Sequence, residues 1–395
     1  FIQSAKEEAI EEIMEAISRK NDGINKKIIV TGCLAERYQK QMDEEFPEID
    51  AVVGIAKNDD IVEIINSVML DRRVVTFGDK LCHNMEGDKL QSTLPHYAYL
   101  RIADGCSNKC SYCAIPLIRG RMRSRKMENI IEEAKKFAEN GVKELVIVAQ
   151  DVTAYGIDLY KKYALPDLLK ELCKIDGIKW IRLLYCYPER MTDELIETIK
   201  TEDKVLNYID IPIQHCNKEI LRNMYRGGDE QSLRELFAKL RREIPGVVLR
   251  TTLITGFPGE TEEQFSELAE FVNDIKFERL GCFAYSAEED TPAAEMPDQV
   301  DEGERQRRAD IITSEQEIRM GEYYAGMVGN TYEVVCEGFD RYSDMYFGRS
   351  MHFAPEIDGM IYFTSAKDKG SLTIGDFVNV KITDVLENNL LGERV

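Results

Sequence analysis

The sequence has no long apolar run, and none of its runs approaches the roughly 20 residues that a membrane-spanning helix needs. The stretch that begins at Phe1 is amphipathic and does not have the pattern expected of a signal peptide. Ten cysteines among 395 residues are too few for a disulfide scaffold. These absences argue against a membrane protein and a disulfide-stapled secreted protein, and they predict a cytoplasmic location.

Basic residues are outnumbered by acidic ones. The chain has 51 Lys and Arg against 72 Asp and Glu, a formal net charge of −21. Nucleic-acid binders normally present a basic face, so this balance argues against them and favours a basic or a small partner. An acidic balance is also common in proteins that need it only for solubility.

The length predicts two or three domains, since single cores stop growing at roughly 250–300 residues. From Phe1 to Thr76, helical spacing in FIQSAKEEAIEEIMEAI and the short apolar runs KKIIVTG and AVVG predict an α/β layer. No strand precedes its first helix, so this layer is expected to be incomplete. Gly78 to Leu94 lacks periodicity and is predicted to be a linker.

Six strand-like runs follow, alternating with helix-like or loop segments. They begin at Tyr97, Glu144, Trp180, Asn207, Val247 and Arg279. Repeated βα units predict a parallel sheet, here an open or partial (βα)6 barrel whose chemistry lies at the carboxyl ends of the strands. After a charged helix from Asp301 to about Tyr324, runs such as TYEVVC, MIYF and DFVNVKI predict a small β-barrel. The predicted domains are 1–77, a linker 78–95, 96–326 and 327–395.

The motif GCSNKCSYC follows the first predicted barrel strand and contains Cys106, Cys110 and Cys113. Three thiolates in so short a loop can converge on one cofactor. A four-iron cluster normally takes four protein ligands, so three leave one iron open to bind a further molecule. The amino and carboxylate groups of a methionine moiety can chelate such an iron.

Two other cofactors fit three thiols less well. Zinc could recruit His83, His96 or His215 as a fourth ligand, but no second close Cys or Cys-His pair accompanies the loop. A ferredoxin motif needs a fourth cysteine nearby and a Cys-Pro end, whereas Cys113 precedes Ala114.

The C-x3-C-x2-C spacing, with Tyr112 before the last cysteine, resembles the radical S-adenosylmethionine (SAM) superfamily. GCSNKCSYCAIPLIRGRMRSR, RTTLITGFPGETEEQF and FAYSAEEDTPAA resemble its methylthiotransferase family. The resemblance implies an N-terminal domain with an auxiliary cluster, a partial barrel and a C-terminal TRAM β-barrel. It implies a 4Fe-4S cluster on the three cysteines, SAM as cofactor, and Tyr112 beside the adenine.

Cys33 in VTGCLAERY matches the third of three family cysteines that hold the auxiliary 4Fe-4S cluster, which is thought to deliver sulfur. The other two have no match here, and the second lies in the family just before a Phe-Ile pair like Phe1-Ile2. The resemblance therefore implies a chain truncated at its start, with one cluster and SAM cleavage without sulfur insertion. The six remaining cysteines are expected to be packing residues: Cys82, Cys173, Cys186, Cys216, Cys282 and Cys336.

Other candidate residues lie near predicted strand ends. Gly256 and Gly259 of GFPGET allow close backbone approach and are expected to shape the SAM pocket, while Thr261 and Gln264 predict a capping box. Gln150, Asp151 and Gln214 are candidates to contact cofactor or substrate. Four arginines beside the cluster motif suggest either a carboxylate-binding patch or a solvated loop: Arg119, Arg121, Arg123 and Arg125.

Two branches of the family are close, one modifying an adenosine in transfer RNA and the other an aspartate in ribosomal protein uS12. WIRLLYCYPER, DIPIQHCNKEIL and AQDVTAYGIDLY resemble the second branch. From Thr331 to Val395 the chain has 6 Lys and Arg against 11 Asp and Glu, which suits a basic protein better than RNA.

The prediction is therefore methylthiolation of the β-carbon of an aspartate in uS12, with flavodoxin or ferredoxin as the kind of reductant. The alternatives are a transfer-RNA adenosine methylthiotransferase and a non-enzymatic zinc module.

Overall fold

The computed structural model describes residues 3–82, 84–87 and 90–395. Phe1 and Ile2, where the sequence analysis places a truncation, lie outside these residues, as do three positions of the predicted linker. The chain forms two compact units. Unit 1 contains Phe1–Asp88, Asp104–Arg123 and Ser286–Met296, and unit 2 contains Lys89–Ala103, Ser124–Tyr285 and Pro297–Val395. Of the helices described, none combines the length and apolarity of a membrane span.

Unit 1 is an α/β layer around a three-stranded parallel sheet of order β1-β2-β3. Its strands are β1 (Ile29–Thr31), β2 (Ala51–Val53) and β3 (Val74–Thr76). Its helices are α1 (Gln3–Asn21), α2 (Cys33–Arg37), α3 (Gln39–Glu45), the 3-10 turn η1 (Ile55–Asp60), α4 (Ile61–Met69), α5 (Ile115–Arg119) and η4 (Pro292–Glu295). Apolar side chains of α1, including Ile13 and Ile17, pack with Val52 in one core, because their helical spacing places them on one face.

Unit 2 contains a six-stranded parallel sheet of order β11-β10-β9-β8-β7-β4, whose sequential neighbours pair as expected for repeated βα units. The strands are β4 (Tyr97–Arg101), β7 (Glu144–Val148), β8 (Trp180–Leu183), β9 (Val205–Asp210), β10 (Val248–Thr255) and β11 (Arg279–Ala284). The short strands β5 (Ala103–Asp104) and β6 (Arg123–Ser124) pair separately. The predicted partial barrel is confirmed.

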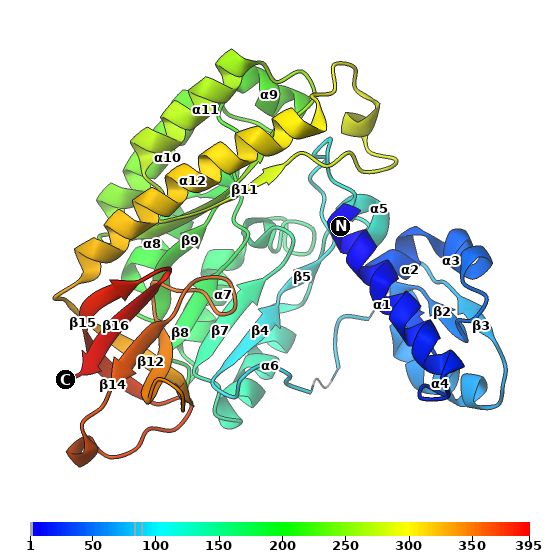
Figure 1. Ribbon diagram of the computed structural model, residues 1–395, viewed down its shortest axis with the longest axis horizontal. Helices are drawn as coiled ribbons and strands as arrows, with labels where there is room; N and C mark the ends of the chain where they lie inside the picture. The colour runs from blue at the N-terminus through cyan, green and yellow to red at the C-terminus, as the bar shows by residue number, and fades with distance from the viewer. Residues whose placement is uncertain (1–2, 83, 88–89) are drawn as a thin grey trace. The chain divides into compact units, whose positions relative to one another are not determined.

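Helices follow the strands and lie along one face of this sheet (Figure 1). They are α6 (Met127–Glu139), α7 (Leu165–Cys173), α8 (Asp193–Thr201), α9 (Lys218–Asn223), α10 (Glu230–Glu243), α11 (Glu262–Ile275) and α12 (Glu302–Met327). Two 3-10 turns, η2 (Val152–Ala154) and η3 (Pro188–Arg190), follow β7 and β8. Buried aromatic side chains of α10 and α11, such as Phe237 and Phe271, make ring contacts on this side.

The C-terminal residues form a closed five-stranded barrel, β12-β13-β14-β16-β15. Its strands are β12 (Thr331–Asp340), β13 (Met345–Ser350), β14 (Ile361–Thr364), β15 (Phe377–Leu386) and β16 (Asn389–Arg394), with η5 (Lys367–Lys369) between β14 and β15. The predicted small β-barrel is confirmed.

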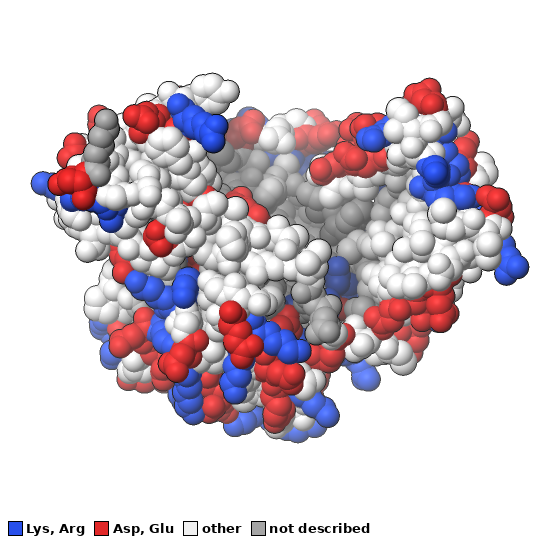
Figure 2. All heavy atoms as spheres, turned by 90° about the horizontal axis from the view of Figure 1, so that it is seen from below, with Lys and Arg blue, Asp and Glu red and all other residues white. Residues whose placement is uncertain are grey.

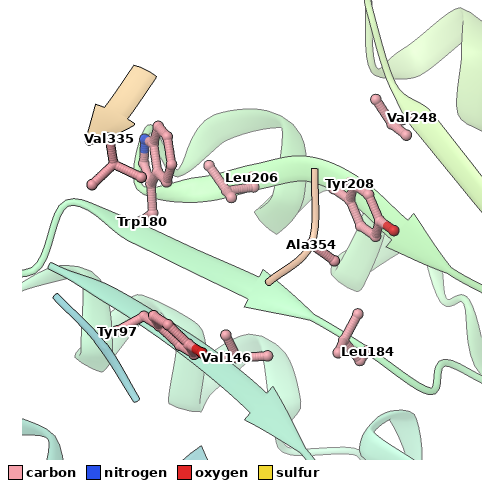
Figure 3. Close-up of a cluster of buried hydrophobic side chains, with 9 residues drawn as sticks. All are labelled: Tyr97, Val146, Trp180, Leu184, Leu206, Tyr208, Val248, Val335 and Ala354. Carbon is pink, nitrogen blue, oxygen red and sulfur yellow. The ribbon is translucent and has the colours of Figure 1, made fainter. Parts of the chain in front are cut away.

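The face of the six-stranded sheet away from the helices carries a second core (Figure 3). Strand side chains such as Tyr97, Trp180 and Tyr208 meet Val335 of β12 and Ala354 of the β13–β14 loop (residues 351–360). All five are at most 5% exposed. The C-terminal barrel therefore shares a core with the inner face of the sheet.

Candidate active site

The three motif cysteines lie in one loop of unit 1, between β5 and α5. Gly105 opens the loop with φ 74°, and an added Cβ would approach the carbonyl oxygen of Arg121 to 2.5 Å. The Cys106 amide donates to the Gly120 carbonyl at 3.1 Å, and the Cys113 amide donates to the Cys110 carbonyl at 3.1 Å. Glycine is therefore needed where the two arms of the loop meet.

The donor set of this loop fits a 4Fe-4S cluster. Cys106, Cys110 and Cys113 are each partly exposed, which keeps their thiols within reach of a cofactor. In the described part of the chain, no three His, Cys, Asp or Glu side chains are arranged around a single metal ion. A cluster does not require such an arrangement, because each cysteine ligates a different iron. Ligation by these three residues stays a prediction, as does the placement of adenine by Tyr112.

Cys33 begins α2 and lies against the segment that follows Cys113. It packs with Ile55, Ala114 and Ile118, and Arg119 Nη2 donates to its sulfur at 3.5 Å. The structure thus places the candidate ligand of the auxiliary cluster beside the motif loop, within the same unit.

The four arginines beside the cluster motif do not form one basic patch, so that prediction is wrong. Arg119 and Arg123 both pair with the buried carboxylate of Asp104, at 2.9 and 3.3 Å. Arg125 is buried in unit 2, where it pairs with Glu133 at 2.6 Å. Arg121 is exposed. Carboxylates of the protein itself neutralise three of the four.

The histidines proposed as zinc ligands have other surroundings. His96 Nε2 lies 3.0 Å from Glu337, and His215 Nε2 lies 3.4 Å from Glu260; both rings are buried. His83 lies outside the described residues. Among the six cysteines expected to pack, Cys82 contradicts the expectation because it is exposed, and the other five are buried or partly buried.

Gln150 and Asp151, which follow β7, have different contacts. Asp151 pairs with Arg190 and accepts the Thr153 hydroxyl at 2.6 Å and the Ala154 amide at 3.2 Å, so it caps η2. Gln150 Oε1 is buried without a hydrogen-bond partner among the described residues. Gln214, at φ 71°, joins β10 through its backbone, which accepts the Ile254 amide at 2.8 Å.

GFPGET forms a tight turn between β10 and α11. The Gly256 and Phe257 amides donate to the buried Glu260 carboxylate, the second at 3.1 Å. The predicted capping box is confirmed, since Thr261 and Gln264 each accept from the other's amide. Gly259 has φ 80°. Sequence analysis missed Glu260, although a carboxylate directly after the second glycine of the turn was its signal.

A second group missed by sequence analysis lies on β9 and β10. Asp210 Oδ2 accepts the Tyr185 amide at 2.9 Å, and its Oδ1 lies 3.6 Å from Arg250 Nε. Burial raises the pKa of the Asp210 carboxyl to about 6, against the opposing effects of the Tyr185 amide and Arg250. A charged residue inside each of the runs NYIDIPI and VVLRTTLI was the available signal.

Comparison with known proteins agrees with this arrangement. Residues 100–272 match the radical SAM superfamily, 328–395 the TRAM domain, and 1–54 the uncharacterized protein family UPF0004. A protein from Thermoanaerobacter sp. (strain X514), named ribosomal protein uS12 methylthiotransferase RimO, is 47% identical over 395 residues, covering 100% of this chain and 89% of its own. The protein of that name from Clostridioides difficile (strain 630) is 46% identical, covering 100% and 88%. This chain belongs to the RimO family of radical SAM methylthiotransferases.

Among solved structures, the radical SAM methyltransferase TsrM from Kitasatospora setae, with tryptophan and a SAM analogue, has a TM-score of 0.56 at 15% identity, covering 72% of this chain and 60% of its own. That likeness shows the fold alone. Membership of the RimO family implies SAM and a 4Fe-4S cluster as cofactors. The non-enzymatic zinc module is therefore wrong.

Proposed function

We propose that this protein transfers a methylthio group to the β-carbon of an aspartate in ribosomal protein uS12. The observation that carries the proposal is the three-cysteine loop after β5, shortly beyond the first strand of a parallel partial barrel, in a chain 46–48% identical to proteins named ribosomal protein uS12 methylthiotransferase. An unactivated C–H bond cannot be deprotonated usefully by a side chain at neutral pH, so the reaction needs radical chemistry.

In this proposal Cys106, Cys110 and Cys113 hold the first cluster, and Tyr112 lies by the adenine of SAM. When bound, the cluster and SAM supply a one-electron route to hydrogen abstraction. Gly256 and Gly259 shape the turn beside the cofactor, and the buried oxygen of Gln150 accepts a hydrogen bond from it. Cys33 matches one ligand of the auxiliary 4Fe-4S cluster of the intact family protein, and one cluster is expected in this chain.

The charge of the C-terminal barrel favours a basic protein as substrate. Thr331 to Val395 contain 6 Lys and Arg against 11 Asp and Glu. On the face drawn in Figure 2, acidic side chains are interspersed with basic ones, and the described atoms there form no continuous basic area. Such a surface suits steering of a basic protein better than gripping RNA. A flavodoxin or ferredoxin as reductant and a location in the cytoplasm complete the proposal.

The cluster assignment is tested by anaerobic reconstitution of the chain and of Cys110→Ala, with Cys82→Ala, an exposed cysteine outside the motif, as the matched control. Iron, sulfide and 5′-deoxyadenosine are measured under dithionite. Cys110→Ala is expected to lose most of its iron and all detectable cleavage, because two thiolates no longer fix the cluster. Equal iron and cleavage in Cys110→Ala and Cys82→Ala would contradict the assignment.

The substrate is tested by deuterium transfer. Recombinant uS12 labelled with β-deuterated aspartate is incubated with the reconstituted chain, and mass spectrometry follows deuterium into 5′-deoxyadenosine. This readout reports hydrogen abstraction even without sulfur insertion. Transfer from uS12 supports the proposal, whereas cleavage stimulated only by bulk transfer RNA would assign the protein to the nucleoside-modifying branch.

A further inference from the structure

The inner face of the six-stranded sheet contains an acidic and a basic side chain, Asp210 and Arg250, next to its apolar core. In the parallel register, Val248 pairs with Tyr208 and Arg250 pairs with Asp210. Tyr208 and Val248 belong to the inner core (Figure 3). Because side chains two positions apart share a face, Asp210 and Arg250 also face inward. Asp210 is the last residue of β9, and Arg250, the third residue of β10, lies beside it in the register. Barrel chemistry takes place at the carboxyl ends of strands, the position that Asp210 has on β9.

The β13–β14 loop fixes Arg250 from the side of the core. Asp358 of this loop lies 3.3 Å from Arg250 Nη1 and accepts the Tyr208 hydroxyl at 2.8 Å and the Ala354 amide at 2.8 Å. Its carboxylate also lies 3.4 Å from Arg279 Nε. Asp358 is 3% exposed at its side chain, so these contacts hold Arg250 in one place without competition from water.

One oxygen of this group lacks a hydrogen-bond partner among the described residues. Asp210 is 3% exposed, yet its Oδ1 has no hydrogen-bond partner among the described residues. The Arg250 side chain is 20% exposed; its Nη1 donates to Asp358, its Nε lies 3.6 Å from Asp210 Oδ1, and it forms a side-chain hydrogen bond with Tyr208. A guanidinium has five N–H donors, and these three contacts leave some of them available to a ligand. Next to a buried carboxyl oxygen that lacks a hydrogen-bond partner, they form a binding position for a polar group, because leaving such groups unpaired is costly.

A carboxylate fits this position. Guanidinium N–H donors bind the two oxygens of a carboxylate side by side, which fixes its plane and the carbon attached to it. Burial raises the pKa of Asp210 to about 6, and the negative charge of an incoming carboxylate would raise it further, so Asp210 takes up a proton as the carboxylate binds and then donates a hydrogen bond to it. This proton uptake offsets part of the repulsion between the incoming carboxylate and Asp210.

We infer that Arg250, held by Asp210 and Asp358, binds the carboxylate of the substrate aspartate and thereby presents its β-carbon for hydrogen abstraction. This inference rests on the proposed function. Arg250 is a specificity-determining residue in this account, and Asp358, supplied by the C-terminal barrel, is a positioning residue that acts through it. SAM also carries a carboxylate, so the test distinguishes binding of the aspartate carboxylate of uS12 from binding of the SAM carboxylate.

The experiment measures dissociation constants of reconstituted protein for full-length uS12 and for uS12 with the target aspartate changed to asparagine. Wild type is expected to bind the aspartate form more tightly. In Arg250→Gln this preference should fall by about 10- to 100-fold, because charge-assisted hydrogen bonds are lost. Arg250→Lys should recover the preference in part, since it keeps the charge but not the planar donor pair. Arg242→Gln, an exposed position on α10, is the matched control.

Thermal unfolding of each variant shows that it is folded, and binding of SAM alone is measured in parallel. An Arg250→Gln variant that is folded and keeps the aspartate preference overturns the inference, as does one that loses only SAM binding, which would assign Arg250 to the cofactor. If wild type does not bind uS12 at all, the proposed function fails instead.

Discussion

Gly256 and Gly259 lie in one turn but are needed for different reasons. Both have left-handed backbones, with φ 71° and 80°. At Gly256 an added Cβ would lie 2.1 Å from Cγ and 2.8 Å from Cα of Arg305, whereas at Gly259 nothing lies within 4 Å. Only Gly256 is fixed by close packing against α12 as well as by its own conformation.

The two glycines therefore predict alanine substitutions of unequal cost. Gly259→Ala should lower the free energy of unfolding by about 1–2 kcal/mol, the cost of the left-handed conformation. Gly256→Ala should lower it by about 2–5 kcal/mol, because overpacking against Arg305 adds to that cost. Chemical denaturation of both variants measures the difference. Equal losses would mean that α12 yields easily and that the close approach is unimportant.

At the scale of elements, the β13–β14 loop is the part of the C-terminal barrel that enters the core of the sheet. Ala354 is fully buried there among strand side chains. Glu356 of the same loop accepts the hydroxyls of Tyr97 and Tyr99, at 2.8 and 3.1 Å. A small residue is required at position 354 because the surrounding side chains leave no room for a larger one.

Ala354→Leu is predicted to lower the free energy of unfolding by about 1–3 kcal/mol through overpacking. Ala325→Leu, at an exposed position of α12, serves as control and should have little effect, since both residues favour helices. Urea midpoints give the comparison. If the two substitutions behave alike, the loop does not pack in solution as described.

Many of the strands could be predicted from the sequence. The apolar runs at Tyr97, Glu144, Trp180 and Arg279 begin the observed strands β4, β7, β8 and β11. Strands β13 and β16 were not predicted. Each contains a glycine, Gly348 or Gly392, where neighbouring strands approach so closely that a Cβ would lie 2.7 Å or less from a backbone oxygen.

The sequence predicts only those features of the candidate site that depend on a few consecutive residues. The cysteine spacing and the capping box of Thr261 can be recognised in a few consecutive residues. Other contacts join segments far apart in the sequence, such as Cys33 with Ile118 and Asp358 with Arg250. The spacing of apolar residues does not predict such contacts. Pairing by Asp104 also could not be anticipated, so the arginine patch was misjudged.

At the scale of the whole molecule, a buried ionic network joins the sheet of unit 2 to the C-terminal barrel. Glu144 of β7 accepts Arg182 of β8 at 2.7 Å and Arg349 of β13 at 2.8 Å. Arg349 Nε also donates to Glu337 at 2.7 Å, beside His96. Burial alone would raise the pKa of Glu144, but Arg349 and Arg182 outweigh it and lower the pKa to about 2.

This lowered pKa predicts acid sensitivity. Unfolded Glu144 titrates near 4.5, so the folded protein binds fewer protons at this site, and the stabilisation is fully present above that pH. As the pH falls from about 5 to 2, about 3 kcal/mol should be lost. Urea unfolding across this range should show a shallower pH slope for Glu144→Gln, which is also less stable at pH 7 because two guanidinium groups lose their partner. Glu132→Gln, exposed on α6, should keep the wild-type slope.

Unit 1 is assembled from three stretches of chain, and this has a consequence for its synthesis. Glu288, on the last stretch, accepts Arg37 Nη1 at 2.9 Å across 251 positions, and Ala293 donates to the Ser111 carbonyl at 2.9 Å. At about 5–20 residues per second, a ribosome needs on the order of ten seconds or more to proceed from the cysteine loop to these residues. Throughout that interval the nascent loop has yet to acquire its final neighbours, so unit 1 closes only after most of the chain has been translated.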